Sequence, residues 1–224
     1  AETLEGARGG SPRVTLRRLL MTADAVGGVW TYALELARGL TGHGVELCLV
    51  VIGPVPDASQ RAEARAIAGL SLVVADLALE WQDGAGPLGA DARHRLQELE
   101  REFVPELIHC NGFREAASGF AAPVLVVAHS CVATWSRACR GQELPSAWAA
   151  YADGIRAGLA TADLVVAPTE AFLENFRAAW RPVPRTAVVR NGLDLEPAAG
   201  VSRQPVILAA GRLWDEAKNV GALV

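Results

Sequence analysis

The sequence has few of the residues that mark metal, redox or nucleic-acid chemistry. Its four cysteines form no Cys-x-x-Cys pair and no paired spacing typical of metal ligands. Lys and Arg number 21 against 25 Asp and Glu, so the formal net charge is −4. Because there is no basic excess, we do not expect nucleic acid as a partner. No resident metal is expected either.

Long apolar runs are also missing. No stretch reaches the ~18 apolar residues of a membrane span, and we identify no targeting segment. Cys48 and Cys110 lie inside strand-like apolar runs, where cysteine acts as a small hydrophobic residue. Reduced thiols of this kind are typical of cytosolic proteins, so we expect a cytoplasmic location.

What the chain does have is a regular alternation of strand-like and helix-like segments. Val45–Ile52 is nearly all apolar, as in a strand buried on both faces, whereas Val29–Leu40 and Ala92–Phe103 show helical periodicity. Such alternation predicts an α/β fold, a Rossmann-like parallel sheet with helices on both faces. Ligands of these folds bind beyond the carboxyl ends of the strands, so functional residues are expected directly after strands.

The composition divides the chain into three parts. Residues 1–13 are polar and rich in glycine, which predicts a disordered tail. Residues 14–199 are expected to form an amino-terminal Rossmann-like domain. Residues 200–224 are expected to be a linker and the first strand and helix start of a second, incomplete Rossmann-like domain.

Three local expectations can be checked against a structure. The first strand is expected to end at Met21 and to be followed by a loop over residues 22–28. Residues 129–145 show no clear period, which predicts irregular backbone. The apolar run 206–210 is typical of a short buried strand.

Gly27 and Gly28 lie between the first strand and the first helix. Two glycines at a helix N-terminus let a ligand approach the backbone closely. A plain tight turn is the explanation that the spacing alone favours, and the glycines are not part of a Gly-x-Gly-x-x-Gly pattern.

Polar residues follow three later strands. His129 comes directly after Val124–Ala128, where its imidazole could exchange hydrogen bonds with a ligand or simply bond a loop carbonyl. Asn111 directly follows another short strand. Glu170 opens a helix after a third strand, and a favourable interaction with the helix dipole is the alternative explanation for it.

Two cations follow the apolar run near the end of the chain. Gly211 breaks this run, and Arg212 and Lys218 come next, a fork and a point charge suited to a diphosphate. The alternative is a solvated helix start in which Asp215 and Glu216 pair with these cations.

Taken together, these segments resemble the family 4 glycosyltransferases, which have the GT-B fold. The resemblance covers about Leu16 to Val224. It rests on four segments in matching order: Gly27-Gly28-Val29, Ala128-His129, Val188-Val-Arg-Asn-Gly-Leu-Asp194 and Gly211-Arg-Leu-Trp-Asp-Glu-Ala-Lys-Asn219.

The resemblance implies two Rossmann-like domains that face each other across a cleft, the first for the acceptor and the second for a nucleotide-diphosphate sugar. It implies transfer of a hexose, with retention of configuration, to a glycan or lipid-linked acceptor in polysaccharide biosynthesis. The nucleotide sugar is a co-substrate, and no further cofactor is expected. The resemblance leaves room for peripheral membrane contact.

It also implies roles for the candidate residues. Arg212 and Lys218 would hold the donor diphosphate and stabilise charge on the leaving group. Gly27 and Gly28 would let the loop backbone approach the donor phosphate. His129 would contact the transferred sugar.

Two further candidates, Asn111 and Glu170, would contact the acceptor or the sugar. The family also carries a Glu-x7-Glu motif further into its second domain. Glu98 and Glu106 have this spacing, but one lies on a helix and the other before a strand, where both are expected to face solvent. Because the second domain, which carries this motif in the family, is expected to be incomplete here, we expect the chain alone to have little or no activity.

Two other functions stay open on the sequence alone. The chain could be a non-catalytic acceptor-binding module that works with a separate donor-binding chain. It could also belong to a GT-B nucleotide-sugar epimerase, although the Gly-Arg-x5-Lys pattern favours a transferase.

Overall fold

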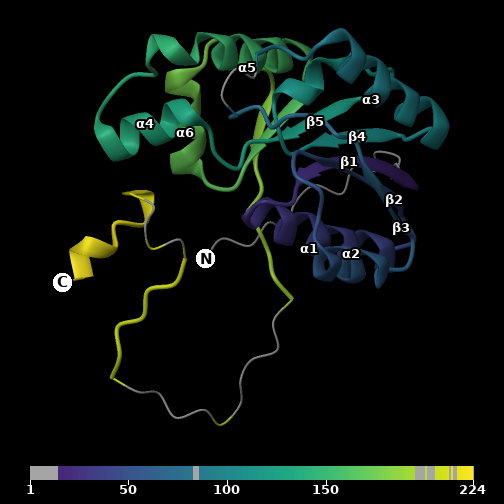
Figure 1. Cartoon of the computed structure of the whole chain (residues 1–224), viewed down its shortest axis with the longest axis horizontal. Helices are drawn as coiled ribbons and strands as arrows, with labels where there is room; N and C mark the ends of the chain where they lie inside the picture. Colours follow the sequence, from purple (N-terminus) through teal and green to yellow (C-terminus); the bar gives the residue numbers. More distant parts are fainter. Residues whose placement is uncertain are drawn as a thin grey trace, which may run out of the picture.

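A parallel sheet forms the centre of the molecule (Figure 1). The computed structural model describes residues 15–82, 86–194, 200, 205–211, 213 and 216–223. The sheet has seven strands in the order β3-β2-β1-β4-β5-β6-β7, and each adjacent pair is parallel. The strands are β1 Arg18–Asp24, β2 Glu46–Ile52, β3 Leu70–Val74, β4 Leu107–Cys110, β5 Val124–Val127, β6 Leu164–Ala167 and β7 Thr186–Val188.

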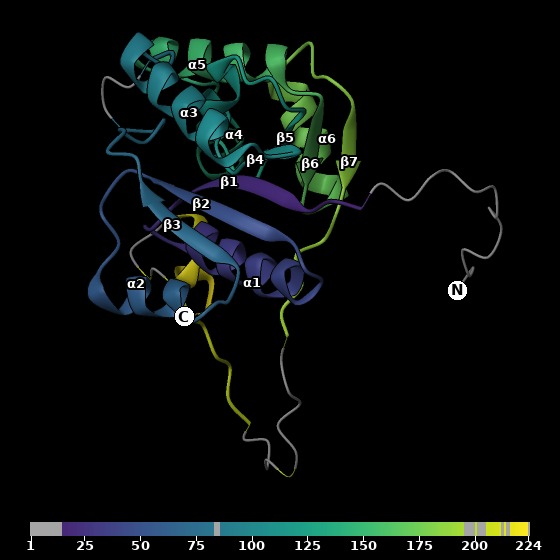
Figure 2. The ribbon, with the colours of Figure 1, turned by 90° about the vertical axis from the view of Figure 1, so that its right-hand side faces the viewer.

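Helices cover both faces of the sheet, which confirms the predicted fold class. Figure 2 shows α1 and α2 on one side of β1–β3, with α3 and α5 on the other. The helices are α1 Gly28–Gly42, α2 Ala58–Arg65, α3 Ala90–Phe103, α4 Val132–Arg140, α5 Ala149–Thr161 and α6 Glu170–Ala179. Short 3-10 segments are η1 Arg114–Ser118, η2 Ser146–Trp148, η3 Glu216–Lys218 and η4 Val220–Leu223.

Alternation along the central strands divides the core into two layers. In β1, Leu20 packs into the layer beneath α3–α6, while its neighbours Leu19 and Met21 pack into the layer beneath α1 and α2. Both sides of each central strand are therefore buried. This explains why β2 reads as a continuous apolar run rather than as alternating polar and apolar residues.

The order of the strands places a natural binding site at one edge. The chain winds outward from β1 to β3 and then returns to β4, which pairs with the other side of β1. The crossovers on either side of the β1–β4 pair run to opposite faces, which opens a crevice at the carboxyl ends of these strands.

Two local expectations are wrong. Thr22, Ala23 and Asp24 continue β1 instead of beginning a loop, because β2 supplies paired partners as far as Ile52. Within the segment expected to be irregular, Val132–Arg140 is helix α4.

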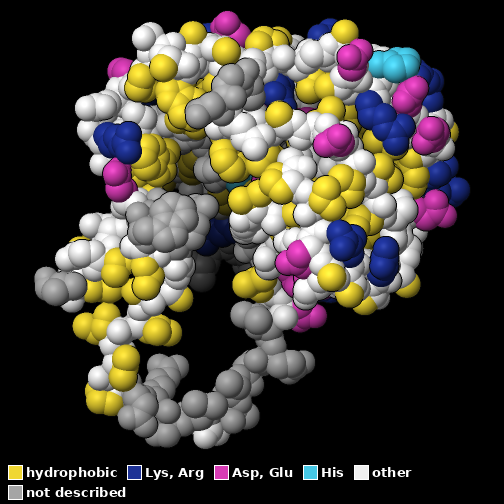
Figure 3. Space-filling view, in the orientation of Figure 1, with side chains coloured by type: hydrophobic (Ala, Val, Ile, Leu, Met, Phe, Trp, Pro, Cys, Tyr) yellow, Lys and Arg dark blue, Asp and Glu magenta, His cyan; other side chains and the backbone are white. Residues whose placement is uncertain are grey.

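The apolar run 206–210 is a third correction. It forms no strand, and Val206, Ile207 and Leu208 are 69%, 82% and 84% exposed. Figure 3 shows exposed hydrophobic side chains along this carboxyl-terminal segment. A strand needs a neighbour for its backbone hydrogen bonds, and none of the described strands pairs with this run.

The domain boundaries stay a prediction. The predicted tail, residues 1–13, lies outside the described residues, and so do 195–199 at the end of the predicted first domain and 201–204 of the predicted linker. None of the described helices is long and apolar enough to cross a membrane.

Candidate functional site

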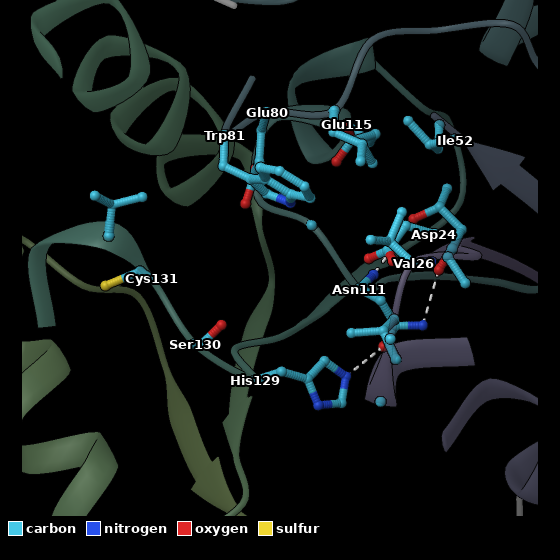
Figure 4. Close-up of a pocket in the computed structure, with 18 of the residues that line it drawn as sticks. Asp24, Val26, Ile52, Glu80, Trp81, Asn111, Glu115, His129, Ser130 and Cys131 are labelled. Atoms are coloured by element: carbon cyan, nitrogen blue, oxygen red, sulfur yellow. Dashed lines mark hydrogen bonds between the residues drawn. The ribbon is translucent and has the colours of Figure 1, made fainter. Parts of the chain in front are cut away.

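A pocket of about 480 Å³ opens at the carboxyl ends of β1, β4 and β5. Its walls come from the β1–α1 loop, the segment after β3, the loops after β4 and β5, and the starts of α4 and α5. Figure 4 shows His129 facing Asn111 on one side of this pocket, with Glu80, Trp81 and Glu115 on the opposite side. The site therefore lies in the crevice that the strand order predicts.

Gly27 and Gly28 line this pocket. Neither has a positive φ, and a Cβ atom added at either position would meet nothing within 4 Å. The fold itself therefore does not require glycine here, which argues against the tight-turn explanation. No side chain among the described residues caps the N-terminus of α1, and the N–H of Trp30 donates to the Gly27 carbonyl at 3.1 Å, which leaves the N–H groups of Gly28 and Val29 to bind an anion.

A hydrogen-bond network fixes His129 at the end of β5. The Asn111 amide nitrogen Nδ2 donates to the backbone carbonyl of Thr22 at 2.8 Å, which identifies Oδ1 as the acceptor end of the amide. This oxygen lies 2.8 Å from Nε2 of His129 and 3.2 Å from Nε2 of His109. Because an amide oxygen only accepts, both imidazoles carry their proton on Nε2. The structure thus favours a side-chain network over a bond from His129 to a loop carbonyl.

Burial keeps these imidazoles neutral. It lowers the pKa of His129 and of His109 to about 4, since neither ring finds a carboxylate partner among the described residues. Tyr32 packs edge-on against His129 with ring centroids 4.5 Å apart. His129 therefore presents a neutral ring whose Nδ1 is available as a hydrogen-bond acceptor.

Two carboxyl groups form the opposite wall, that of the partly buried Glu80 and that of the buried Glu115. Oε2 of Glu80 accepts hydrogen bonds from the backbone N–H groups of Phe113 and Arg114, at 2.9 and 3.0 Å. Glu115 is 3% exposed, and its Oε1 lies 3.8 Å from Nε of Arg114. Burial, reinforced by the charge of Glu115, raises the pKa of Glu80 to about 8, and burial also raises the pKa of Glu115.

Arg114 attaches the segment after β3 to the wall that carries these acids. Its guanidinium donates to the backbone carbonyl of Ala78 and, at 3.3 Å, to that of Gly86. The buried arginine therefore positions Glu80 and holds a positive charge behind the pocket wall.

The remaining candidates lie elsewhere. Glu170 is exposed in the first turn of α6 and Lys218 is exposed in η3, and neither is among the described residues that line the pocket. Arg212 lies outside the described residues.

The carboxyl-terminal segment makes two local contacts. Gly211 adopts φ 142°, and a Cβ there would lie 3.7 Å from the Lys218 side chain. Glu216 pairs with Arg140 of α4 at 3.2 Å.

Comparison with known proteins agrees with this geometry. The family model described as Glycosyltransferase Family 4 matches residues 26–197, which include both sides of the pocket. The chain belongs to glycosyltransferase family 4. No curated protein matches it.

Solved glycosyltransferases share the fold of this family 4 chain. A UDP-glucosyltransferase from Polygonum tinctorium, capable of glucosylating indoxyl, superposes with a TM-score of 0.54 at 12% identity, over 79% of this chain and 52% of that one. UGT2 from Phytolacca americana, solved with UDP-2-fluoro-glucose and pterostilbene, gives 0.52 at 11% identity, over 76% and 53%. A glycosyltransferase from Rickettsia africae gives 0.52 at 13% identity, over 80% and 44%. The chain thus spans about half the length of these structures.

Several residues of this family 4 pocket were not expected from the sequence. Asp24 lines it because β1 is longer than expected. Glu80 and Glu115 were missed, although both follow strands and the rule that directs attention to strand ends could have found them. Nothing in the local sequence shows that Trp81 and Trp148 also lie at this pocket.

Proposed function

We propose that this chain is the acceptor side of a retaining glycosyltransferase, which transfers a hexose from a nucleotide-diphosphate sugar to a glycan or lipid-linked acceptor in polysaccharide biosynthesis. The observation that carries the proposal is the pocket at the β1–β4 switch, where the glycine loop and His129 lie together. The uncapped N-terminus of α1 and the adjacent imidazole suit a phosphate next to a sugar.

Each pocket residue then has a role. The backbone of Gly27 and Gly28 approaches the donor phosphate. His129, kept neutral and oriented by Asn111, contacts the transferred sugar, and Asn111 contributes a further contact to sugar or acceptor. Because the ring stays neutral, it adds no charge that would bind the leaving diphosphate at the wrong place.

Arg212 and Lys218 are proposed to hold the donor diphosphate and to stabilise the charge that develops on it. Glu170 is proposed only as an outer contact to the acceptor, since it lies on the surface at the start of α6. We propose that the donor sugar and base are bound by a second domain. The chain's coverage of about half of the solved glycosyltransferases supports this division, and the 224-residue chain alone is expected to show little or no transfer.

The four free cysteines, three of them buried, suit a reducing compartment, so we propose a cytoplasmic location with peripheral membrane contact where the acceptor is lipid-linked.

A variant assay on the complete protein tests the proposal. Release of nucleoside diphosphate is measured with UDP- and GDP-hexoses, with and without extracts that contain acceptors. His129→Ala is expected to lower transfer by a factor of about 100 or more, the cost of losing one polar contact to the reacting sugar. The matched control Glu174→Gln changes an exposed acid of α6 and should leave the rate unchanged. Equal rates for both variants would contradict the role of the pocket.

A further inference from the structure

The pocket has an unusual balance of charge for a site next to a phosphate. Among the described residues, its lining contains no Lys and no Arg. It contains three acids and four large aromatic side chains, namely Asp24, Glu80, Glu115, Trp81, Trp135, Trp148 and Tyr151. The part of the pocket away from the glycine loop therefore offers oxygen atoms and ring faces but no cation.

Glu115 leaves hydrogen-bonding capacity directed at this space. Its side chain is 4% exposed, and no other described residue donates a hydrogen bond to its carboxylate. Nε of Arg114, at 3.8 Å, is also buried and has no hydrogen-bond partner among the described atoms. The carboxylate accepts from the backbone N–H of Glu115 itself, and its remaining lone pairs can accept from ligand hydroxyl groups.

The two acids flank one glycine. A Cβ atom at Gly112 would lie 2.4 Å from Oε2 of Glu115 and 3.5 Å from Oε2 of Glu80. A side chain at this position would displace the Glu115 carboxylate, whereas it would lie at an ordinary contact distance from Glu80. With Arg114 balancing one charge and with burial raising the pKa of Glu80 to about 8, the pair offers both a proton donor and acceptors near neutral pH. Such a pair suits hydroxyl groups, which both donate and accept.

The aromatic residues supply the second half of a sugar-binding surface. Trp81 is 45% exposed, and Trp148 packs edge-on against Tyr151 with ring centroids 5.6 Å apart. The Tyr151 hydroxyl accepts from the backbone N–H of Val132 at 3.1 Å, so this ring is held in place. Indole faces carry negative electrostatic potential and attract the weakly positive C–H groups on the face of a sugar ring.

From this geometry we propose that the pocket binds the acceptor through an uncharged polyhydroxylated ring, a sugar or cyclitol unit, and rejects rings that carry phosphate or carboxylate. The inference rests on the proposed function, because it takes this pocket as the acceptor site. A phosphate on the ring would face Asp24 and Glu115 in surroundings where water screens charge weakly, while the Arg114 guanidinium lies behind this wall and donates to the carbonyls of Ala78 and Gly86.

Binding to the purified chain tests this specificity. Saturation-transfer NMR and tryptophan fluorescence are recorded with three matched pairs: glucose and glucose 6-phosphate, N-acetylglucosamine and its 6-phosphate, and myo-inositol and myo-inositol 1-phosphate. At least one neutral compound is expected to bind in the millimolar range, and its phosphorylated partner at least about tenfold more weakly. The difference should shrink as salt is raised. Tighter binding of a phosphorylated partner, or no binding of any neutral compound up to about 100 mM, overturns the proposal.

Two variants identify the residues responsible. Trp81→Ala removes a largely exposed ring and should weaken binding of the neutral ligand by at least about fivefold without unfolding the chain. Glu115→Gln keeps the shape of the side chain and should reduce the discrimination against phosphate by at least about threefold. Glu174→Gln should change neither value. If both pocket variants behave like this control, the assigned surface is wrong.

Assays on the complete protein separate this inference from the proposed function. Transfer from a nucleotide sugar to an acceptor that is phosphorylated on the accepting ring would overturn the specificity but support the glycosyltransferase. Failure to use any nucleotide sugar, with neutral rings still bound, would overturn the proposed function and leave the binding specificity standing.

Discussion

Asn111 determines the state of the imidazole at the centre of the site. Its amide is fixed by the Thr22 carbonyl, so its oxygen is the end that faces His129 and His109. One side chain thereby fixes two tautomers, and burial keeps both rings uncharged. The chemistry offered by His129 is thus decided by a neighbouring side chain.

The first prediction follows from this arrangement. In the wild-type chain, nitrogen NMR should show His129 as the neutral Nε2–H tautomer from pH 6 to 8. Asn111→Asp places a carboxylate 2.8 Å from the ring nitrogen, so the pKa of His129 should rise by about 2 or more. A wild-type His129 that titrates near 6.5 would show that the network is not formed as described.

At this scale the sequence predicts some site residues and misses others. Asn111 and His129 could be found because each directly follows an apolar strand, and position alone brings them to one edge of the sheet. Glu80 and Glu115 also follow strands, but they were missed because an acid is normally read as solvated. Their burial depends on Arg114 and on contacts with Gly112 that only the folded chain creates.

At the scale of elements, apolar patterning predicts well what packs through large side chains. The run 45–52 corresponds to β2, and the periodic segment 92–103 lies within α3. Helix α4 was missed because its buried residues, Ala133, Thr134 and Ser136, are small or polar and give no apolar period. Its start is capped by the thiol of Cys131, which accepts from the backbone N–H of Thr134 at 3.4 Å, whereas a hydroxyl or carboxylate is the usual signal.

The run 206–210 shows the opposite error. Five apolar residues are typical of a buried strand, but a strand is stable only when a neighbouring strand takes up its hydrogen bonds. This requirement cannot be read from the run itself. Composition therefore predicts which segments can be strands, and only pairing decides which of them are.

The end of α3 supplies the second prediction. Val104, the C-cap residue, has φ 51°, a left-handed conformation that costs a β-branched residue free energy that glycine does not lose. Val104→Gly should therefore raise the free energy of unfolding by about 1 kcal/mol in urea denaturation. Val55 is equally exposed, at 63%, and has no positive φ, so Val55→Gly should not stabilise the chain. Equal effects at both positions would show that backbone strain at Val104 is negligible.

At the scale of the whole molecule, the buried acids link pocket chemistry to folding stability. The pKa of Glu80, about 8, lies above its usual 4.5, so between these values the folded chain binds more protons than the unfolded chain. The stabilisation is complete below pH 4.5 and is lost as the pH rises towards 8. The two imidazoles act oppositely, since their lowered pKa costs stability as the pH falls from 6.5 to 4.

The third prediction uses the range from pH 6.5 upward, in which the two imidazoles are neutral in the folded chain and lose only their remaining protons in the unfolded chain. From pH 6.5 to 8.5 the free energy of unfolding should fall by about 1–2 kcal/mol, and Glu115 should act in the same direction. Glu80→Gln retains an oxygen for the two backbone N–H groups but cannot ionise, so most of this decline should disappear. Urea denaturation at both pH values measures the effect, with Glu174→Gln as the control. An unchanged decline in Glu80→Gln would assign the pH dependence to another group.

The fold and its coverage of solved structures support the proposal that the chain alone shows little or no transfer. The described residues form one sheet with a pocket at the β1–β4 switch, and the chain spans about half the length of solved glycosyltransferases. The family and the fold follow from these findings, whereas the identity of donor and acceptor depends on contacts that a second domain is proposed to supply.

The central claim is tested most directly by following the anomeric protons of a nucleotide sugar by NMR, with the complete protein and a neutral sugar acceptor. We predict that the donor signal decays only when acceptor is present, and that a new glycoside signal appears with the same anomeric configuration as the donor. A product of inverted configuration would contradict retention. Conversion of the donor to an epimer, with no acceptor consumed, would contradict the assignment as a glycosyltransferase acting on an acceptor.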